Sequence, residues 1–508
     1  MATDLMYTTN PNEWTRLEGV YVNRKKPDPR ITGTQLNTVG MLFQAVRGPL
    51  TPQYVGSPQE ASALYGGRDA GGGGAIVGGG WLATLNRGFS WPMVLCRVAA
   101  AGATAASVNL LAANGDHILT VTATSVGAWA NGVTGYGITA AATLATDGSS
   151  DHRNVVVTYA GKTYTYKNID VHTSGADNTL QVVGSDPTNP VTITKFATGL
   201  PAVAAAANLT GGSDGTVGAS DYATAFPSVA HHAKAKIIVI AEQAMNTTTA
   251  TYAQIVLCGA DAADASKAEP TKIFCTCSTT YQGSAATEVT NMTTAIATLS
   301  RNIVWCYNPS QTLDTTITPP TLVEGGSHLD MACILSQTAA DINPGEEDSI
   351  ALLAGVSAVH NDGLTRGDLI TLREGGVSTL EHVDGGFQFH SAVTVTGAEI
   401  ADVRTEQYLT GGLAQYLRHD VKKKGTETRR RQVIAKVTSW LRGLQRAENY
   451  VAPNDPDKGD AINVAWVDTF DERAANMGRL LTQVRTMPHL NNLVLETDMG
   501  TGVTVVKS

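Results

Sequence analysis

The stretch of sequence that decides the fold lies between residues 17 and 88. It contains, in order, Leu17-Glu18-Gly19-Val20-Tyr21, Val39-Gly40-Met41-Leu42-Phe43-Gln44-Ala45-Val46-Arg47-Gly48-Pro49, Tyr54-Val55, Ala63-Leu64-Tyr65-Gly66-Gly67 and Asn86-Arg87-Gly88. The apolar run 39–46 predicts a strand that is buried on both faces. Ser57 followed by Pro58 predicts a helix that begins at Ser57, with the proline in its first turn. The predicted order is an arm, a buried strand, an Arg-Gly-Pro turn, a short strand, a helix and a glycine stop.

The composition of the chain narrows its class. A length of 508 residues suggests about two to four domains, and an apolar fraction of 43% is ample for their cores. The charged fraction is only 16%, and the net charge of −9 argues against general nucleic-acid binding, which usually needs a basic protein. No run of about 18 apolar residues occurs, so no membrane span is expected. The first residues lack the pattern of a secretory signal, which is therefore not expected either.

Changes in composition divide the chain into six expected parts. The chain starts with a polar segment that contains several prolines, and a pattern of mixed strands and helices follows it. A series of short β-prone segments interrupts this mixed pattern, which then resumes. The expected parts are an N-terminal arm (1–30), the first part of an α/β domain (31–102), an inserted β-rich domain (103–217), the second part of the α/β domain (218–400), a C-terminal α/β domain (401–499) and a C-terminal arm (500–508). The predicted fold class is therefore α/β, or α+β, with an inserted, mostly β domain.

Apolar periodicity predicts the main elements. Segments 155–159 and 163–166 are rich in β-branched and aromatic residues and flank Gly161, which predicts a hairpin. Further expected strands are 93–98, 237–240, 273–277, 303–307, 462–467 and 493–496. Further expected helices are 81–85, 252–258, 286–299, 346–359, most of 401–450 and 472–485, with one or two helical turns at 202–207.

Two motifs border the inserted part. Gly127, Trp129 and Asn131 form a Gly-x-Trp-x-Asn element, and Leu209-Thr210-Gly211-Gly212-Ser213-Asp214-Gly215 forms a Leu-x-Gly-Gly-x-Asp-Gly element. Together with the order of segments in residues 17–88 and the expected strand, helix, strand order of residues 462–508, they resemble contractile-phage tail sheath proteins, closest to the Mu-like branch. Residues 320–450 fit less well, because Asp402-Val403-Arg404-Thr405 is all that is present of a Trp-Gly-x-Arg-Thr element common in that family.

The resemblance implies a structural role. Sheath subunits have an α/β core at the inner radius, built from the N- and C-terminal parts, and a protruding inserted domain. They assemble in the host bacterial cytoplasm as stacked hexameric rings or helical strands around a tail tube, with baseplate and tail terminator proteins as further partners of the virion. The extended, metastable sheath contracts and drives the tube through the host envelope for genome ejection. The resemblance implies no catalytic site, cofactor or metal, no nucleic acid and no membrane insertion. A sheath of a phage-derived contractile injection particle is the alternative.

A short β-prone segment lies near each end of the chain, and neither segment is part of a predicted hydrophobic core. Val503, Thr504, Val505 and Val506 follow the flexible Gly500 and Gly502, and Val20, Tyr21 and Val22 follow the polar start. A lone terminal strand is unstable unless it joins a sheet, so addition to the sheet edge of a neighbouring subunit is one interpretation. A frayed tail or an edge strand within the same subunit is the other. The family resemblance favours linkage between subunits.

A basic amphipathic helix is expected over residues 427–449. One apolar stripe is formed by Val433, Val437, Trp440, Leu441 and Leu444. The opposite face carries Arg431, Arg442 and Arg446, and residues 401–450 hold eleven Lys and Arg against five Asp and Glu. This face suits an acidic partner, which the resemblance identifies as the tail tube. A solvated helix face is the open alternative.

Other chemical sites fit the sequence poorly. Ser213 stands in a literal G-x-S-x-G, which makes a serine hydrolase an alternative interpretation, but the sequence lacks the apolar strand before the serine and the helix directly after it that this motif requires. Gly161-Lys162-Thr163 lacks the first glycine and the helix of a phosphate loop. Cys275 and Cys277 lack the C-x-x-C spacing, and His231-His232 lacks a ligand spacing, so buried thiols and no metal site are expected.

Overall fold

A computed structural model describes most of the chain. The described residues are 36–66, 88–132, 137–159, 161–170, 190–241, 272–277, 283–296, 300–314, 321–324, 326–345, 353, 355–418, 425–447, 450–469 and 478–487. They separate into two compact units, one ending at Tyr408 and the other beginning at Leu409. Predictions for 20–22, 81–85, 252–258, 493–496 and 500–506 lie outside the described residues.

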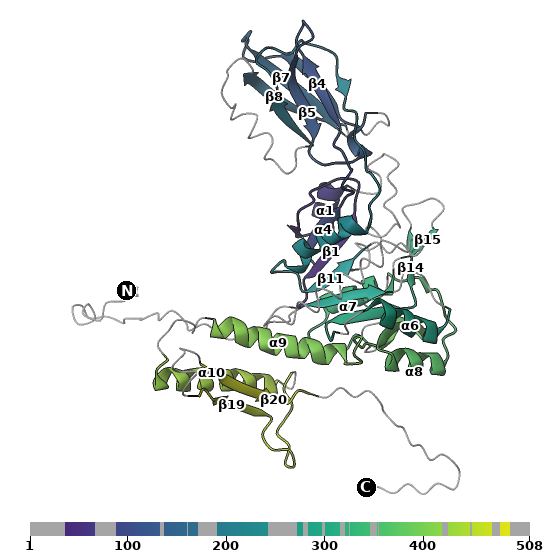
Figure 1. Ribbon diagram of the computed structural model, residues 1–508, viewed down its shortest axis with the longest axis vertical. Coiled ribbons are helices and arrows are strands. Elements are labelled where there is room, and N and C mark those ends of the chain that lie inside the picture. Colours follow the sequence, from purple (N-terminus) through teal and green to yellow (C-terminus); the bar gives the residue numbers. More distant parts are fainter. Residues whose placement is uncertain are drawn as a thin grey trace, which may run out of the picture. The chain divides into compact units, whose positions relative to one another are not determined.

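The first unit is organised around an eight-stranded sheet. Its strands run in the order β18 (Gly386–Ser391), β17 (Val377–Val383), β13 (Ile303–Tyr307), β12 (Ile273–Cys277), β11 (Ile237–Ile240), β1 (Val39–Gln44), β3 (Met93–Val98), β2 (Gln53–Val55). The neighbouring strands β1 and β11 are labelled in Figure 1. The six inner strands are parallel, and only the edge strands β2 and β18 pair antiparallel. The strands predicted at 39–46, 93–98, 237–240, 273–277 and 303–307 are confirmed.

Helices cover both faces of this sheet, as a parallel sheet requires. One apolar cluster joins α1 (Pro58–Tyr65) and α7 (Ser327–Gln337) to side chains of β1 such as Met41 and Phe43. The other joins α4 (Ala219–Ala230), α6 (Ala285–Ala295) and α8 (Arg366–Glu374) to the opposite face. The predicted start of α1 is confirmed, because the Ser57 hydroxyl accepts a hydrogen bond from the Glu60 amide and Pro58 follows it.

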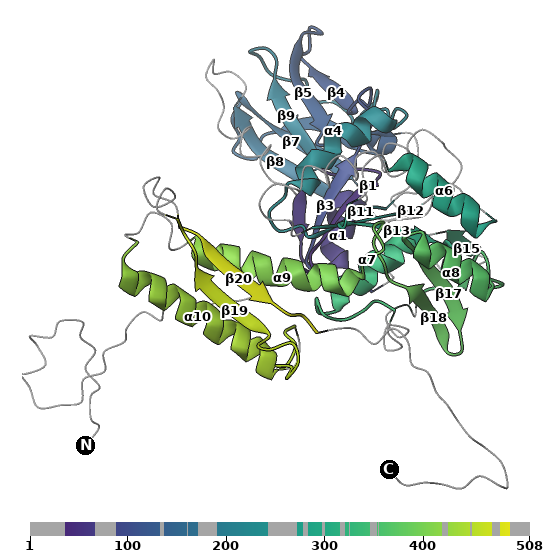
Figure 2. The ribbon, with the colours of Figure 1, turned by 60° about the horizontal axis from the view of Figure 1, so that its bottom comes forward.

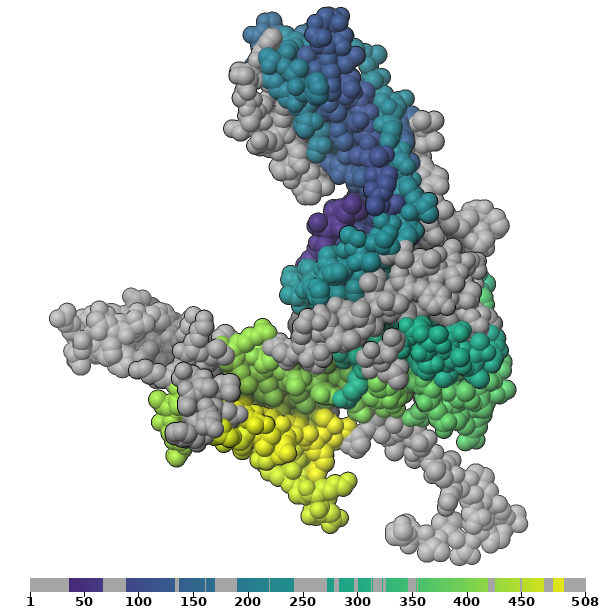
Figure 3. All heavy atoms as spheres, in the orientation of Figure 1, coloured from purple at the N-terminus to yellow at the C-terminus, as the bar shows by residue number. Residues whose placement is uncertain are grey.

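Two small sheets enclose the core of the inserted β domain. One contains β4 (Ser107–Leu111), β5 (His117–Ala123) and β9 (Val191–Lys195). The other contains β10 (Ala207–Asn208), β6 (Thr139–Leu144), β7 (His152–Tyr159) and β8 (Lys162–Asp170). The predicted hairpin is confirmed as β7 and β8, which turn at Gly161 with a φ of 75°. In Figure 3 this domain is the blue and teal part that adjoins the purple segment with which the described residues begin.

Two helix predictions are wrong in this unit. Ala358–Val359, the end of the helix expected at 346–359, forms strand β16 and pairs with β14 (Ser310–Asp314), which also pairs with β15 (Thr321–Glu324). Residues 202–207 contain no helical turn, although alanine favours helix. Their amides bond across the inserted domain instead: Ala202 donates to the Leu111 carbonyl and Ala204 to the Ala142 carbonyl.

The second unit consists of a helix on a hairpin. Helix α9 (Ile400–Leu417) carries the chain into it, and α10 (Glu427–Arg446) packs on β19 (Ile462–Trp466), which pairs antiparallel with β20 (Leu480–Val484) (Figure 2). The expected helices of 401–450 and the strand 462–467 are confirmed. The helix expected at 472–485 is wrong for Leu480–Val484, because pairing with β19 imposes a two-residue period there. No described helix is both long enough and apolar enough to cross a membrane.

Candidate functional site

Helix α10 buries one apolar stripe and leaves Arg431 and Arg446 exposed. Val433, Val437 and Leu441 are buried, as the predicted apolar stripe requires, and the stripe faces the hairpin side of the unit. The Thr426 hydroxyl caps the helix by accepting from the Arg429 amide. The helix is therefore held by its stripe, and the opposite face is available to solvent or to a partner.

The three predicted contact arginines differ in their surroundings. Arg431 is exposed and pairs with Glu427 one turn earlier, at 3.0 Å. Arg442 is partly buried and pairs with Asp460 at 2.5 Å, while Arg446 is exposed. The Asp460 pKa is lowered, mainly by the hydrogen bond from the Ile462 amide and further by Arg442. Arg431 and Arg446 thus present charge more freely than Arg442 does.

A second arginine contact, which sequence reasoning missed, ties α10 to the hairpin. Arg430 pairs with the nearly buried Asp468 at 3.1 Å, and its guanidinium carbon lies 5.6 Å from the centre of the Trp466 ring. Arg430 is the middle member of the run Arg429-Arg430-Arg431. In the structure its middle member belongs to the fold of the unit rather than to the outer face.

The hairpin of the second unit has no further strand paired along its edges among the residues that the structure describes. In the described part of the chain, β19 and β20 pair along their length only with each other, and the bridge from Val451 to Thr486 lies just beyond β20. A two-stranded sheet is marginally stable alone, and here α10 supports one face of it. The unpaired backbone groups of such edges are a template for further strands. The arm residues predicted to supply them (20–22 and 503–506, with the glycines at 500 and 502) lie outside the described residues.

The two motifs that border the inserted domain meet in space. The Asn131 side chain donates to the Gly212 carbonyl at 2.8 Å and accepts from the Gly212 amide at 2.9 Å. The Asp214 carboxylate accepts from the Ala128 amide at 3.0 Å, and the Gly132 amide donates to the Leu209 carbonyl at 3.0 Å. We refer to this junction of residues 125–132 with residues 209–214 as the root of the inserted domain.

Close backbone approach explains the glycines of the root. A Cβ atom on Gly212 would lie 2.4 Å from the Gly127 carbonyl oxygen, well inside van der Waals contact. Gly127 itself has a φ of 126°, a conformation that side chains disfavour. The glycines are thus required by the contact between the two motifs, which the spacing of the motifs alone does not reveal.

Arg97, on strand β3, connects the root to the main sheet through hydrogen bonds. It is 3% exposed on β3 and donates to the carbonyls of Val126 (3.0 Å), Val46 (3.4 Å) and Gly48 (3.4 Å). Burial lowers the pKa of Arg97 to about 10, and the charge of Asp214 opposes that shift. Sequence reasoning missed this residue; the available signal was a lone charge inside the apolar strand Met93–Val98.

Arg404 plays a comparable role near the other end of the unit. It is 1% exposed on α9 and donates to the carbonyls of Leu335 and Thr338 at the end of α7, as well as to the Asn37 side chain. A guanidinium at a helix C-terminus is favoured by the helix dipole. The Asp-Val-Arg-Thr element therefore provides a buried structural arginine.

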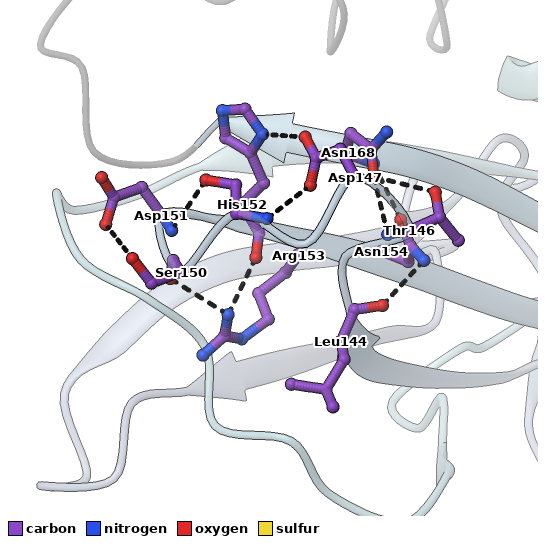
Figure 4. A network of polar contacts seen from close by, with 10 residues as sticks. Leu144, Thr146, Asp147, Ser150, Asp151, His152, Arg153, Asn154 and Asn168 are labelled. Carbon is purple, nitrogen blue, oxygen red and sulfur yellow. Dashed lines mark hydrogen bonds and ion pairs between the residues drawn. The ribbon is translucent and has the colours of Figure 1, made fainter.

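The outer end of the inserted domain carries a polar loop between β6 and β7. Asp147 accepts a 2.5 Å hydrogen bond from His152 and another from the Ser149 amide, while Arg153 donates to the Ser150 and His152 carbonyls (Figure 4). These hydrogen bonds lower the pKa of Asp147, that of His152 most. The contacts lie within the loop and organise it locally.

The alternative chemical sites are not assembled. Ser213 forms an isolated bridge with Thr104 and accepts from the Gly215 amide, and α4 begins only at Ala219, so the strand, serine, helix geometry of a nucleophile elbow is missing. Among the described residues no group of His, Cys, Asp and Glu has metal-binding geometry. The five described cysteines are buried and outside any disulfide, which agrees with the predicted buried thiols, and burial raises the pKa of Cys306 well above its usual value.

Comparisons with known proteins rest on structure. No family model and no curated protein sequence matches the chain. A sheath tail protein from Desulfitobacterium hafniense matches at a TM-score of 0.55 and 15% identity, covering 92% of this chain and 100% of the other. A sheath tail protein from Listeria innocua matches at 0.58 and 12%, covering 89% and 96%. The contracted helical sheath of the anti-feeding prophage matches at 0.55 and 12%, covering 94% and 98%. The chain therefore has the fold of contractile sheath proteins, as its sequence predicts.

Proposed function

We propose that this chain is the structural subunit of a contractile sheath, which polymerises around a tube, stores an extended state and contracts to drive the tube through an envelope. The observation that carries the proposal is the fold match over about nine-tenths of the chain to sheath proteins from three sources. The meeting of the two border motifs at the root supports it, because those motifs carried the resemblance in the sequence.

Two kinds of particle would use such a subunit. The virion of a contractile-tailed phage is the first, with the sheath assembled in the host cytoplasm. A phage-derived injection particle is the second, and it is favoured by one observation: two of the similar structures are the helical sheath and the baseplate of the anti-feeding prophage. Tube, baseplate and terminator proteins are the proposed partners in either case.

The mechanism we propose for cohesion is strand exchange between subunits. The free edges of β19 and β20 would accept the terminal segments 20–22 and 503–506 of neighbouring copies, which completes a sheet that is too small alone. Backbone hydrogen bonds supply the attraction, and Gly500 and Gly502 provide the swivel. Subunits joined in this way rotate against each other during contraction without separating.

The face of α10 is the proposed contact with the tube. Arg431 and Arg446 are exposed on this face, whereas the charge of Arg442 is partly neutralised by its ion pair with Asp460. We therefore assign to Arg431 and Arg446 the larger part of the attraction to an acidic tube. Exposed ion pairs are each weak, at about 0–1 kcal/mol, and are screened by salt. Many weak contacts hold an extended sheath and release it quickly.

Electron microscopy of the purified chain tests the proposal directly. We expect tubes or polysheath at raised protein concentration, with a regular axial repeat. Persistent monomers under every condition, with and without a tube protein, would contradict it. A serine-directed activity probe with Ser213→Ala as control tests the hydrolase alternative, for which we expect no specific labelling.

A further inference from the structure

The inserted domain is joined to the sheet by a thin neck. The chain enters through Thr104 and leaves through Ser213, and these two residues pair with each other through 2.9 and 3.0 Å backbone hydrogen bonds. Ser107 and Thr210 form the next such pair. Two paired strands keep the two crossings together, but they resist bending and twisting only weakly. Other contacts are needed to fix the orientation of the domain.

Arg47 supplies contacts on both sides of this neck. It stands in the Arg-Gly-Pro turn after β1 and donates to the Ala63 carbonyl in the last turn of α1, at 3.0 Å. On the other side it donates to the Tyr159 hydroxyl at the end of β7. Its guanidinium carbon lies 5.1 Å from the centre of the Tyr159 ring and 5.7 Å from that of Trp129, within the range of cation–π attraction.

The partners of Arg47 are themselves fixed. The rings of Trp129 and Tyr159 meet edge to face, with centroids 5.4 Å apart, and the Trp129 indole donates to the Ser125 carbonyl. The Ser125 hydroxyl accepts from the Gly48 amide, which immediately follows Arg47. The guanidinium therefore binds a rigid aromatic corner of the inserted domain rather than a mobile side chain.

Arg47 and Arg97 differ in a way that separates their roles. Arg97 is 3% exposed and bonds only to backbone carbonyls, so its removal leaves buried acceptors unpaired. Arg47 is only partly buried and reaches the inserted domain through side chains. Its loss removes a side-chain link between the sheet and the inserted domain, together with the exposed bond to the Ala63 carbonyl. The backbone contacts that Arg97 and Gly48 make with the inserted domain stay in place.

We propose that Arg47, with Trp129 and Tyr159, is a clasp that fixes the orientation of the inserted β domain on the eight-stranded sheet. Arg47 acts as a positioning residue, and with the clasp closed the domain moves with the sheet as one body. When the clasp opens, the neck of Thr104 and Ser213 becomes a hinge. The inference concerns the single subunit, so it stands or fails independently of whether the chain forms a sheath.

Hydrogen exchange measured by mass spectrometry on the purified subunit tests the clasp. In Arg47→Ala we expect about tenfold or faster exchange of the root amide of Ala128 and of the Gly48 amide, which binds the root at Ser125, because a charge-assisted hydrogen bond and the ring contacts are lost. Amides inside β1 and β7 should keep their wild-type rates. Small-angle X-ray scattering of the same variant should show a broader distribution of the longest interatomic distances.

Arg153→Ala is the matched control. Arg153 is also a partly buried arginine of the inserted domain, but it bonds to the Ser150, His152 and Pro201 carbonyls at the outer end, away from the neck (Figure 4). Its removal should speed exchange in the β6–β7 loop and leave the root unchanged. Tyr159→Phe removes only the hydroxyl contact and should give a smaller acceleration at the root, which decides the question if Arg47→Ala does not fold.

Two results overturn the clasp. Root amides that exchange at the wild-type rate in Arg47→Ala and Tyr159→Phe mean that the neck and Arg97 fix the domain without Arg47. Acceleration that spreads evenly through β6, β7 and the rest of the inserted domain means that Arg47 stabilises its fold rather than its orientation.

Discussion

The root of the inserted domain and the hairpin of the second unit show opposite ways of using backbone polar groups. At the root, side chains of Asn131, Asp214 and Arg97 occupy amides and carbonyls of both crossing segments. At the hairpin, β19 and β20 have partners on one side only within the described residues. The first junction is complete inside one subunit, whereas the second has room for strands from elsewhere. The comparison separates a junction whose backbone groups are hydrogen-bonded within the subunit from a sheet edge whose backbone groups we propose are completed by a neighbouring subunit.

The sharpest way to break this comparison is to remove the proposed donor strand. A chain without residues 500–508 should fold with an unchanged melting temperature and form no polymer, because the hairpin edges then stay unfilled. Electron microscopy and sedimentation measure assembly, and circular dichroism measures the fold. Full-length Lys507→Ala, which keeps the strand, should polymerise normally. Normal polymer from the truncated chain would remove strand exchange from the mechanism.

The next largest effect is expected at the closed junction. Arg97→Leu leaves the carbonyls of Val46, Gly48 and Val126 without their donor and Asp214 without its nearby charge. We expect a loss of about 3 kcal/mol or more in the free energy of unfolding, measured by denaturant titration. Lys162→Ala, at the exposed turn of the β7–β8 hairpin, should change it by less than about 0.5 kcal/mol. Equal effects of the two substitutions would show that the root is not a special junction.

Charge reversal on α10 should distinguish arginines that stabilise the subunit from arginines that contact the tube. Arg431→Glu with Arg446→Glu removes exposed charge and should abolish loading onto a tube while polysheath formation and the melting temperature are kept. Arg442→Glu breaks the pair with Asp460 and should lower subunit stability slightly, with a smaller effect on loading. Co-sedimentation with purified tube protein measures loading. Unchanged loading by the double variant would exclude this face as the tube contact.

The smallest expected effect is a dependence on acid. The folded-state pKa of Asp460 is lowered below its unfolded value of about 3.9, so its contribution to stability is present above that pH and is lost as the pH falls through the folded pKa. The same sign holds for Asp147. Asp460→Asn and Asp147→Asn should therefore melt below the wild type at pH 7, and the difference should shrink at pH 3. A difference that persists at pH 3 would point to packing rather than ionisation.

The buried strands and helices could be predicted from the sequence, but the contacts that join distant segments could not. Apolar runs such as Val39–Val46 and Ile237–Ile240 have no good alternative to a buried strand, and Ser57-Pro58 marks a helix start by local hydrogen bonding. Leu480, Leu481 and Val484 fit both a helix and a strand, and only pairing with β19 decided between them. Arg47 meets Tyr159 across more than a hundred residues, a contact that no local period encodes. The paired role of Arg430 was hidden for the same reason.

The order of strands in the main sheet has a consequence for synthesis. Strand β1 lies between β3 and β11, and the whole inserted domain separates those two neighbours in the sequence. A chain that leaves the ribosome from its N-terminus has therefore finished the inserted domain before the partner on one side of β1 exists. The small β domain matures first, and the first strands of the large sheet wait with an open side until residue 237 and its successors emerge. We therefore expect a chaperone that shields this open side during synthesis to raise the yield of folded protein.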